Sequence, residues 1–144
     1  MSFSITDILE NPLILSELKL AWIDSEPGGS GGHEEGGFIV ADDSGNLIVV
    51  RWGKGLQNEI VLPQHRNCFI DGKNIVASFH THPNTGKDFQ QEPSLTDIRA
   101  VTDDFDLKGE FYLGEFVISE QNIYLIEPLG DYHVIGATKV IFER

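Results

Sequence analysis

Two histidines of this chain have the type and the spacing of metal ligands. His80 and His82 stand at the end of an apolar run, and Pro83 follows them directly. In an extended strand, residues two apart point to the same face of the sheet, so both imidazoles can reach one point. Two ligands of a small cation must converge in this way. The spacing therefore favours a metal site at the end of this strand.

Asp97 is the expected third ligand. It lies three residues after Ser94, and this pattern before an apolar run predicts the first turn of a helix. Zinc suits two imidazoles and one carboxylate, and three protein ligands leave a fourth position open, as in catalytic zinc sites. A His-x-His pair alone would be weak support, because two solvated or loop-bound histidines at a strand end look the same.

The combined pattern resembles the JAMM (MPN+, Mov34-type) motif of zinc isopeptidases. The matching residues are His80, His82 and Pro83, followed by Ser94 and Asp97. The family also has a glutamate a few residues ahead of a glycine and an apolar strand. Here Glu34 lies three residues ahead of Gly37. The spacing between glutamate and glycine in the family motif favours Glu34 over its neighbour Glu35. Glu35 stays open as the alternative.

The resemblance implies a role for each residue of the motif. His80, His82 and Asp97 would bind Zn²⁺, which lowers the pKa of a bound water towards neutrality. Glu34 would accept the proton of that water and later pass it to the leaving amine. Ser94 would donate a hydrogen bond to the oxygen that becomes negative, and it can cap the helix at the same time.

The function that follows is that of a zinc metallopeptidase or isopeptidase with a protein or peptide substrate. Substrates in this family often end in the Gly-Gly tail of a ubiquitin-like protein, because only a strand without side chains fits close to the zinc. Two alternatives remain open. One is a catalytically silent binding module with the same fold, although inactive relatives typically lose metal ligands that are present here. The other is a metal hydrolase that acts on a non-protein amide.

The chain departs from the eukaryotic members of the family in three places. The loop 84–93, between Pro83 and Ser94, is a few residues longer and should reshape the substrate groove rather than the metal site. The glycine-rich segment 28–32 lies just before Glu34, which suggests a mobile base. The long insertions that grip ubiquitin in eukaryotic deubiquitinases are missing. The chain therefore resembles a compact, prokaryotic-type member, and a specific ubiquitin substrate does not follow.

Other polar and aromatic residues are weaker candidates. His33 adjoins Glu34 and is a minor candidate for contact with substrate or metal. His65 and His133 have no partner pattern and are expected at the surface. Trp22 and Trp52 are expected to pack in the core.

The elements that must position these residues are predicted from periodicity and turn signals. Helices are expected with an N-cap at Thr6 or Asp7, over residues 16–24, and from Ser94 or Thr96 to about Phe105. Strands are expected at 38–41, 47–52, 60–62, 74–79, 111–118, 122–127, 132–135 and 138–142. This order implies one domain over residues 1–144 with a mixed α/β (α+β) sheet and a helix on each side. The resemblance adds a strongly curved sheet, as in the cytidine-deaminase-like JAMM fold.

Composition excludes several classes of function. The net charge of −13 repels phosphate backbones, so nucleic acid is not an expected partner. No apolar run approaches 18 residues, so no membrane span is expected, and no secretory signal is recognised. The one cysteine, Cys68, fits a reducing cytoplasm and is expected to be buried. The oligomeric state is not predicted.

Overall fold

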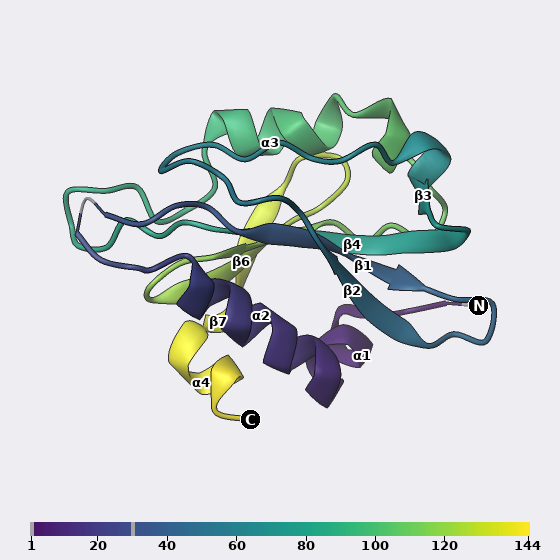
Figure 1. Ribbon diagram of the computed structural model, residues 1–144, viewed down its shortest axis with the longest axis horizontal. Helices are drawn as coiled ribbons and strands as arrows, with labels where there is room; N and C mark the ends of the chain where they lie inside the picture. Colours follow the sequence, from purple (N-terminus) through teal and green to yellow (C-terminus); the bar gives the residue numbers. More distant parts are fainter. Residues whose placement is uncertain (1, 30) are drawn as a thin grey trace.

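The computed structural model describes residues 2–29 and 31–144, which form a mixed α+β fold around an open seven-stranded sheet (Figure 1). The strand order is β2-β1-β4-β5-β6-β7, and the short β3 pairs with β4. In chain order the strands are β1 (Gly36–Ala41), β2 (Leu47–Arg51), β3 (Phe69–Ile70), β4 (Lys73–Thr81), β5 (Glu115–Ile118), β6 (Asn122–Ile126) and β7 (Tyr132–Ala137). The helices are α1 (Ile5–Leu9), α2 (Pro12–Asp24), α3 (Leu95–Thr102) and α4 (Thr138–Phe142), with short 3-10 turns η1 (Arg66–Cys68) and η2 (Phe105–Leu107).

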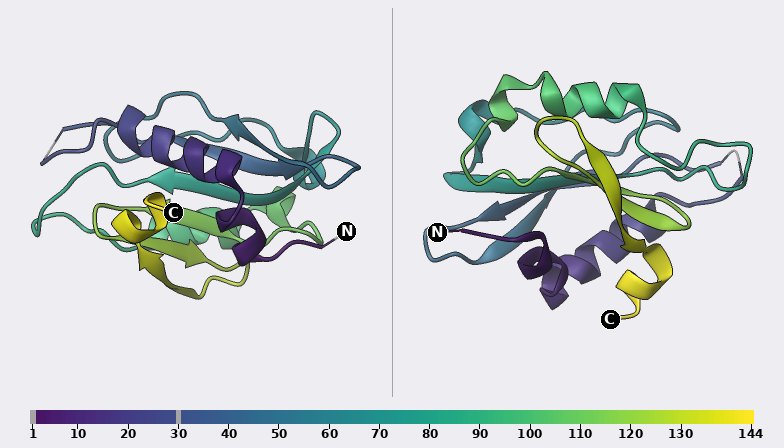
Figure 2. Two further views of the ribbon diagram at one scale, coloured as in Figure 1. Left: turned by 90° about the horizontal axis from the view of Figure 1, so that it is seen from below. Right: turned by 180° about the vertical axis from the view of Figure 1, so that it is seen from behind.

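Helices cover both faces of the sheet. Figures 1 and 2 show α3 on one face and α1, α2 and α4 on the other. Each face has its own apolar core, and successive residues of β1 alternate between the two. Ile39 packs with α2 and α4, whereas Phe38 packs with Val101 of α3. Because it is covered on both faces, β1 consists of buried residues throughout, as strands in the middle of such sheets do.

The pairing of β4 with β5 sets the geometry of the site. These two strands are parallel, whereas the other strand pairs of the sheet are antiparallel. A parallel pair needs a long crossover connection, and here it carries the loop 84–93 and α3 over one face of the sheet. The C-terminal end of β4, with His80, therefore opens towards the N-terminal end of α3.

Several element predictions are confirmed. Strands occur where they were expected at 38–41, 47–52, 74–79, 122–127 and 132–135. A helix follows Ser94, which caps it, and ends at Thr102 rather than near Phe105. The two N-terminal helices also exist, but their starts differ from the prediction. Ser4 caps the first and has Asp7 as its capping-box partner, and the second begins at Pro12, with Asn11 as its cap.

Three strand predictions are wrong. Residues 60–62 form no strand, and the strand expected at 111–118 begins only at Glu115. Residues 138–142 form the helix α4 instead of a strand. A five-residue segment with only three apolar residues, two of them β-branched, does not distinguish a strand from a short helix, because it is too short to show a period. In α4, Ile141 packs into the core beneath the sheet.

The length and apolar character of the helices bear on the question of membrane crossing. Among the described residues, none of the helices has both the length and the apolar character that crossing a bilayer requires.

A glycine at the start of β1, Gly36, is required by close packing. A Cβ atom on Gly36 would lie 2.5 Å from Cε3 of Trp52 and 2.6 Å from the carbonyl oxygen of Phe79. Both distances are shorter than real Cβ contacts allow. The indole of Trp52 therefore lies directly on the backbone just after Glu34 and Glu35, and it fixes where this segment enters the sheet.

We expect Gly36→Ala to lower the free energy of unfolding by about 1–3 kcal/mol, because the added methyl group overpacks a rigid contact. Gly53→Ala is the matched control, since a Cβ there meets no atom within 4 Å. Its effect should stay within about 0.5 kcal/mol. Urea unfolding of both variants tests this, and equal stabilities would contradict the packing argument.

Candidate metal centre

The end of β4 brings the two histidines together. His80 lies in the strand, and His82 extends its pairing by donating its main-chain N–H to the carbonyl oxygen of Ile118 at 2.8 Å. Their side chains point to the same side, and the two Nε2 atoms are 3.3 Å apart. His80 is buried and His82 is half-buried. The convergence expected from the spacing is therefore present.

Asp97 completes the group from the first turn of α3. One carboxylate oxygen, Oδ2, lies 3.0 Å from Nε2 of His82, and the other, Oδ1, lies 3.2 Å from Nε2 of His80. A capping box with Ser94 holds the carboxylate in place. The main-chain N–H of Ser94 donates to Oδ2 of Asp97 at 2.8 Å, and the main-chain N–H of Asp97 donates to Oγ of Ser94 at 3.0 Å.

The three side chains fit a single cation. Ligand atoms at about 2.0 Å from a tetrahedral zinc lie about 3.3 Å from one another. The two Nε2 atoms have this separation, at 3.3 Å, and each lies 3.0–3.2 Å from a different oxygen of the Asp97 carboxylate. His80, His82 and Asp97 could therefore hold a metal ion.

The outer nitrogen of each histidine has a hydrogen-bond acceptor. Nδ1 of His80 lies 2.8 Å from a carboxylate oxygen of Glu115, and Nδ1 of His82 lies 3.1 Å from the carbonyl oxygen of Gln91. Both partners can only accept, so Nδ1 carries the proton in each ring. When the rings are neutral, each Nε2 lone pair faces the cluster. Hydrogen bonds of this kind orient the histidine ligands of metal sites.

Neither of these acceptors was predicted. Glu115 is 35 residues from His80 and reaches it only because β4 and β5 are neighbours. A signal was nevertheless present, since Glu115 is a charged residue inside an otherwise apolar run. A carboxylate buried in a sheet requires a partner, and that requirement would have flagged it.

The carbonyl of Gln91 is positioned by the side chain of the same residue. Its amide nitrogen donates to the carbonyl oxygens of Asn84 at 3.0 Å and Phe89 at 3.2 Å. These bonds tie the start of the loop 84–93 to its middle. The loop was expected to shape the substrate groove, and it also contacts the ligand His82.

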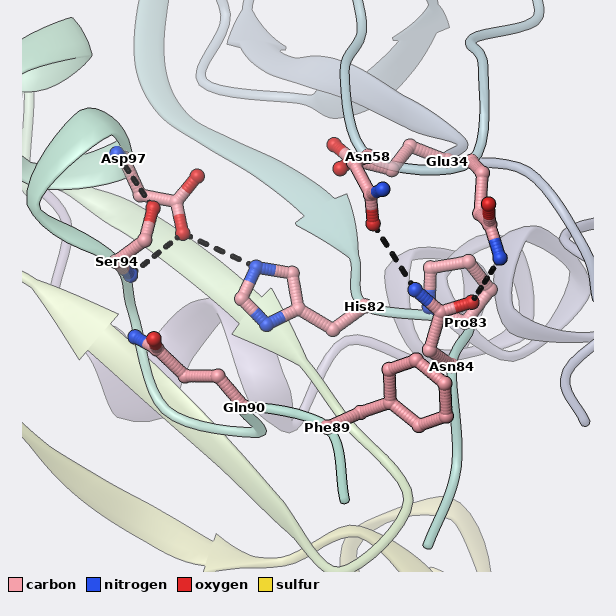
Figure 3. Close-up of a pocket in the computed structure, with 10 residues that line it drawn as sticks. Glu34, Asn58, His82, Pro83, Asn84, Phe89, Gln90, Ser94 and Asp97 are labelled. Atoms are coloured by element: carbon pink, nitrogen blue, oxygen red, sulfur yellow. Dashed lines mark hydrogen bonds and ion pairs between the residues drawn. The ribbon is translucent and has the colours of Figure 1, made fainter. Parts of the chain in front are cut away.

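Glu34 faces the same cleft from the opposite side. Figure 3 shows it across from Ser94 and Asp97. Its main-chain N–H donates to the carbonyl oxygen of Leu56 at 2.7 Å, and its own carbonyl oxygen accepts from Gly55 at 2.9 Å. These contacts anchor the main chain of Glu34, for which the glycine-rich segment suggested mobility.

Burial raises the pKa of Glu34 to about 7, although the nearby His80 and His82 act in the opposite direction. A carboxyl group with a pKa near neutrality is suited to accept and release a proton at cellular pH.

Glu35, the alternative base, has different surroundings. It forms an ion pair with Arg51 at 2.5 Å and a 2.6 Å contact with Nε2 of His33. The structure thus places His33 against Glu35 and does not bring it to the ligand group. Of the two neighbouring glutamates, Glu34 lines the cleft and Glu35 is engaged elsewhere.

Electrostatics in the cluster are dominated by the two carboxylates. Burial alone would lower the pKa of His80, but Glu115 and Asp97 raise it well above its usual value. Burial alone would raise the pKa of Asp97, but hydrogen bonds from His80 and His82 lower it strongly. Asp97 therefore stays ionised, as a metal ligand must be.

The cleft beside the cluster has two cavities, and the one next to His82 is lined mainly by polar residues. A cavity of about 180 Å³ adjoins His82 and Asp97, and one of about 110 Å³ adjoins His80. Across the larger one, Asn84 connects two loops (Figure 3). It donates to Oδ1 of Asn58 at 3.0 Å and accepts from Gln57 at 3.2 Å. The amide side chains were not singled out from the sequence.

One of the minor predictions is wrong, and the others are confirmed. His65 is half-buried rather than exposed, and it bridges the carbonyl of Pro63 and the carboxylate of Asp104 at 2.6 Å each. His133 is exposed, as expected. Trp52 is buried and Trp22 packs against the core, also as expected, and Cys68 is a buried free thiol.

In comparisons with known proteins, no protein-family model, no curated protein and no solved structure matches this chain.

The raised pKa of Glu34 predicts a pH-dependent stability effect in the metal-free protein. The usual pKa of 4.5 applies to the unfolded chain, so the folded state binds the proton more tightly. Stability from this group is fully present below pH 4.5 and is lost as the pH rises through 7. Glu34→Gln should therefore stabilise the protein at pH 8, by up to about 3 kcal/mol, relative to its effect at pH 4.5.

Urea unfolding at both pH values measures this difference. Glu35→Gln is the matched control, because it removes an ion pair with Arg51 and should destabilise the protein at pH 8. An effect of Glu34→Gln that is the same at pH 4.5 and pH 8 would contradict the burial of an ionisable carboxyl group at this position.

Proposed function

We propose that this protein is a zinc-dependent hydrolase of the JAMM type that cuts a peptide or isopeptide bond. One observation carries the proposal. Nε2 of His80, Nε2 of His82 and the carboxylate of Asp97 converge, and Glu34 faces the same cleft. The fold is the mixed α+β arrangement that the resemblance requires, and we propose that it is the curved, cytidine-deaminase-like sheet of that family.

Zinc is the metal that this donor set favours. Two imidazole nitrogens 3.3 Å apart, each 3.0–3.2 Å from one of the two oxygens of a carboxylate, suit a small tetrahedral ion. Calcium and magnesium prefer six or more oxygen ligands, and the two histidines argue against them. Bound here with three protein ligands, zinc would act as a Lewis acid at its open position and activate water for attack on a carbonyl.

The residues of the chain supply the proton transfers and the orientation. Glu34 would accept a proton from the attacking water and deliver it to the leaving amine. Ser94 already accepts a hydrogen bond at Oγ from the main chain of Asp97. Its hydroxyl proton can still be donated to the oxygen that becomes negative during the reaction. Both side chains line the larger cavity.

The walls of the cleft support an extended polypeptide as substrate. Gln57, Asn58, Asn84 and Gln90 line the larger cavity together with Phe89. Amide side chains present a donor and an acceptor side by side, which matches the main chain of a peptide. By resemblance to the JAMM family, the substrate would be the Gly-Gly tail of a ubiquitin-like protein, cut in the cytoplasm.

We expect the protein, prepared without chelator, to hold one zinc ion per chain. Glu34→Gln should keep the zinc but lower kcat at least about 100-fold, because the proton acceptor is removed. His80→Ala should lose both zinc and activity. Zinc is measured by mass spectrometry, and activity with a ubiquitin-like protein whose Gly-Gly end is joined to a lysine side chain of a reporter peptide.

Glu35→Gln serves as the control, because it removes the same charge at the neighbouring position in the sequence. This variant should keep its activity. Full activity of a zinc-loaded Glu34→Gln would transfer the role of the base to Glu35. A zinc-loaded protein that cleaves neither peptides nor Gly-Gly conjugates would instead favour the binding module or a non-protein amide as substrate.

A further inference from the structure

Glu115 is a carboxylate buried in the interior of the sheet. It is the first residue of β5, and only 4% of its surface is exposed. Burial of an ionised carboxylate is unfavourable unless hydrogen bonds and positive charge compensate it. The contacts of Glu115 show where that compensation comes from.

Both carboxylate oxygens of Glu115 are hydrogen-bonded. Oε2 lies 2.8 Å from Nδ1 of His80, and Oε1 accepts from the hydroxyl of Ser78 at 2.9 Å. The hydroxyl of Ser78 lies in turn 2.7 Å from the hydroxyl of Tyr112. These four residues form a buried chain that ends at Nδ1 of His80, on the side of the ring away from the proposed metal centre. The register of β4 and β5 produces it, because Ser78 is paired directly with Glu115.

We propose that Glu115 is a positioning residue that holds the ring of His80 with Nε2 towards the metal and strengthens metal binding. The inference rests on the proposed metal centre. The carboxylate fixes the proton on Nδ1, because it can only accept. Its negative charge also makes the imidazole a stronger electron-pair donor at Nε2. Ser78 and Tyr112 keep the carboxylate in the orientation that this requires.

His82, the second proposed histidine ligand, has a different kind of hydrogen-bond partner. Nδ1 of His82 donates to a neutral carbonyl of the loop 84–93, whereas Nδ1 of His80 donates to a charged group inside the sheet. His80 is therefore the rigid ligand, fixed by the core of the protein. Loss of Glu115 should weaken metal binding through His80 alone.

The test is the zinc affinity of the full-length protein, measured by competition with a chromogenic chelator. We expect Glu115→Gln to weaken zinc binding about 10-fold and Glu115→Ala about 100-fold, the range usual for such acceptors. Glutamine keeps an acceptor oxygen for Nδ1 of His80 without the charge, and it should rescue part of the loss. Glu120→Gln is the control, because it removes an equal charge at an exposed position past the end of β5.

A merely structural role predicts a different result. Glu115→Gln would then lower the melting temperature of the metal-free protein, while the folded fraction would bind zinc as tightly as the unmodified protein. That outcome would overturn the proposal. If Glu115→Gln does not fold, Tyr112→Phe tests the proposal instead, because it removes one hydroxyl group and keeps the ring. It should weaken zinc binding about fivefold, and unchanged affinity would count against the chain of hydrogen bonds.

A second readout needs no substrate. In zinc-loaded protein with ¹⁵N-labelled histidine, long-range ¹H–¹⁵N spectra should show His80 protonated at Nδ1 and bound through Nε2. Bonding through Nδ1 would overturn the proposal. An unmodified protein that binds zinc in this way but hydrolyses nothing would refute the proposed hydrolase and leave the role of Glu115 intact.

Discussion

The imidazole of His80 lies between two carboxylates, and the arrangement of the rest of the site follows from that position. Glu115 contacts Nδ1 from inside the sheet, and Asp97 lies 3.2 Å from Nε2 on the side of the cleft. Two negative groups around one buried ring require positive charge between them, from a protonated imidazole or from a cation. A dication at Nε2 meets that requirement and also brings His82 into the same group. The electrostatics of the buried residues therefore accommodate a cation at Nε2 as well as a protonated imidazole.

The fold supplies this arrangement through the parallel pair β4 and β5. Their pairing places Glu115 beside Ser78 and so within reach of His80. The crossover between the two strands returns as α3, whose capping box presents Asp97 at the end of β4. Glu34 reaches the cleft from the other side, where the packing of Trp52 on Gly36 fixes the start of β1. The strands β4 and β5 and the helix α3 therefore hold His80, Glu115 and Asp97, while the loop 84–93 supplies the main-chain carbonyl that contacts His82.

The features of the site that could be predicted from the sequence are those that depend on local spacing. His80 and His82 share a face because strands have a period of two, and Ser94 and Asp97 form a capping box that is visible as a four-residue pattern. Glu115 was missed because its contact with His80 spans 35 residues and arises only from strand pairing. The strand expected at 138–142 is a helix, because five residues are too few to show a period. The spacing of the motif favoured Glu34 over Glu35, and the tertiary contacts of the two residues now distinguish them.

Anomalous diffraction at the zinc edge, from crystals of protein purified without chelator, tests the central claim most directly. The account predicts one peak between Nε2 of His80, Nε2 of His82 and the carboxylate of Asp97, about 2.0–2.2 Å from each ligand atom. Nδ1 of His80 should remain on Glu115 in that structure. A fully folded protein without a peak at this position, or with a metal bound by other residues, would contradict the assignment of a metal centre and the hydrolytic function proposed for it.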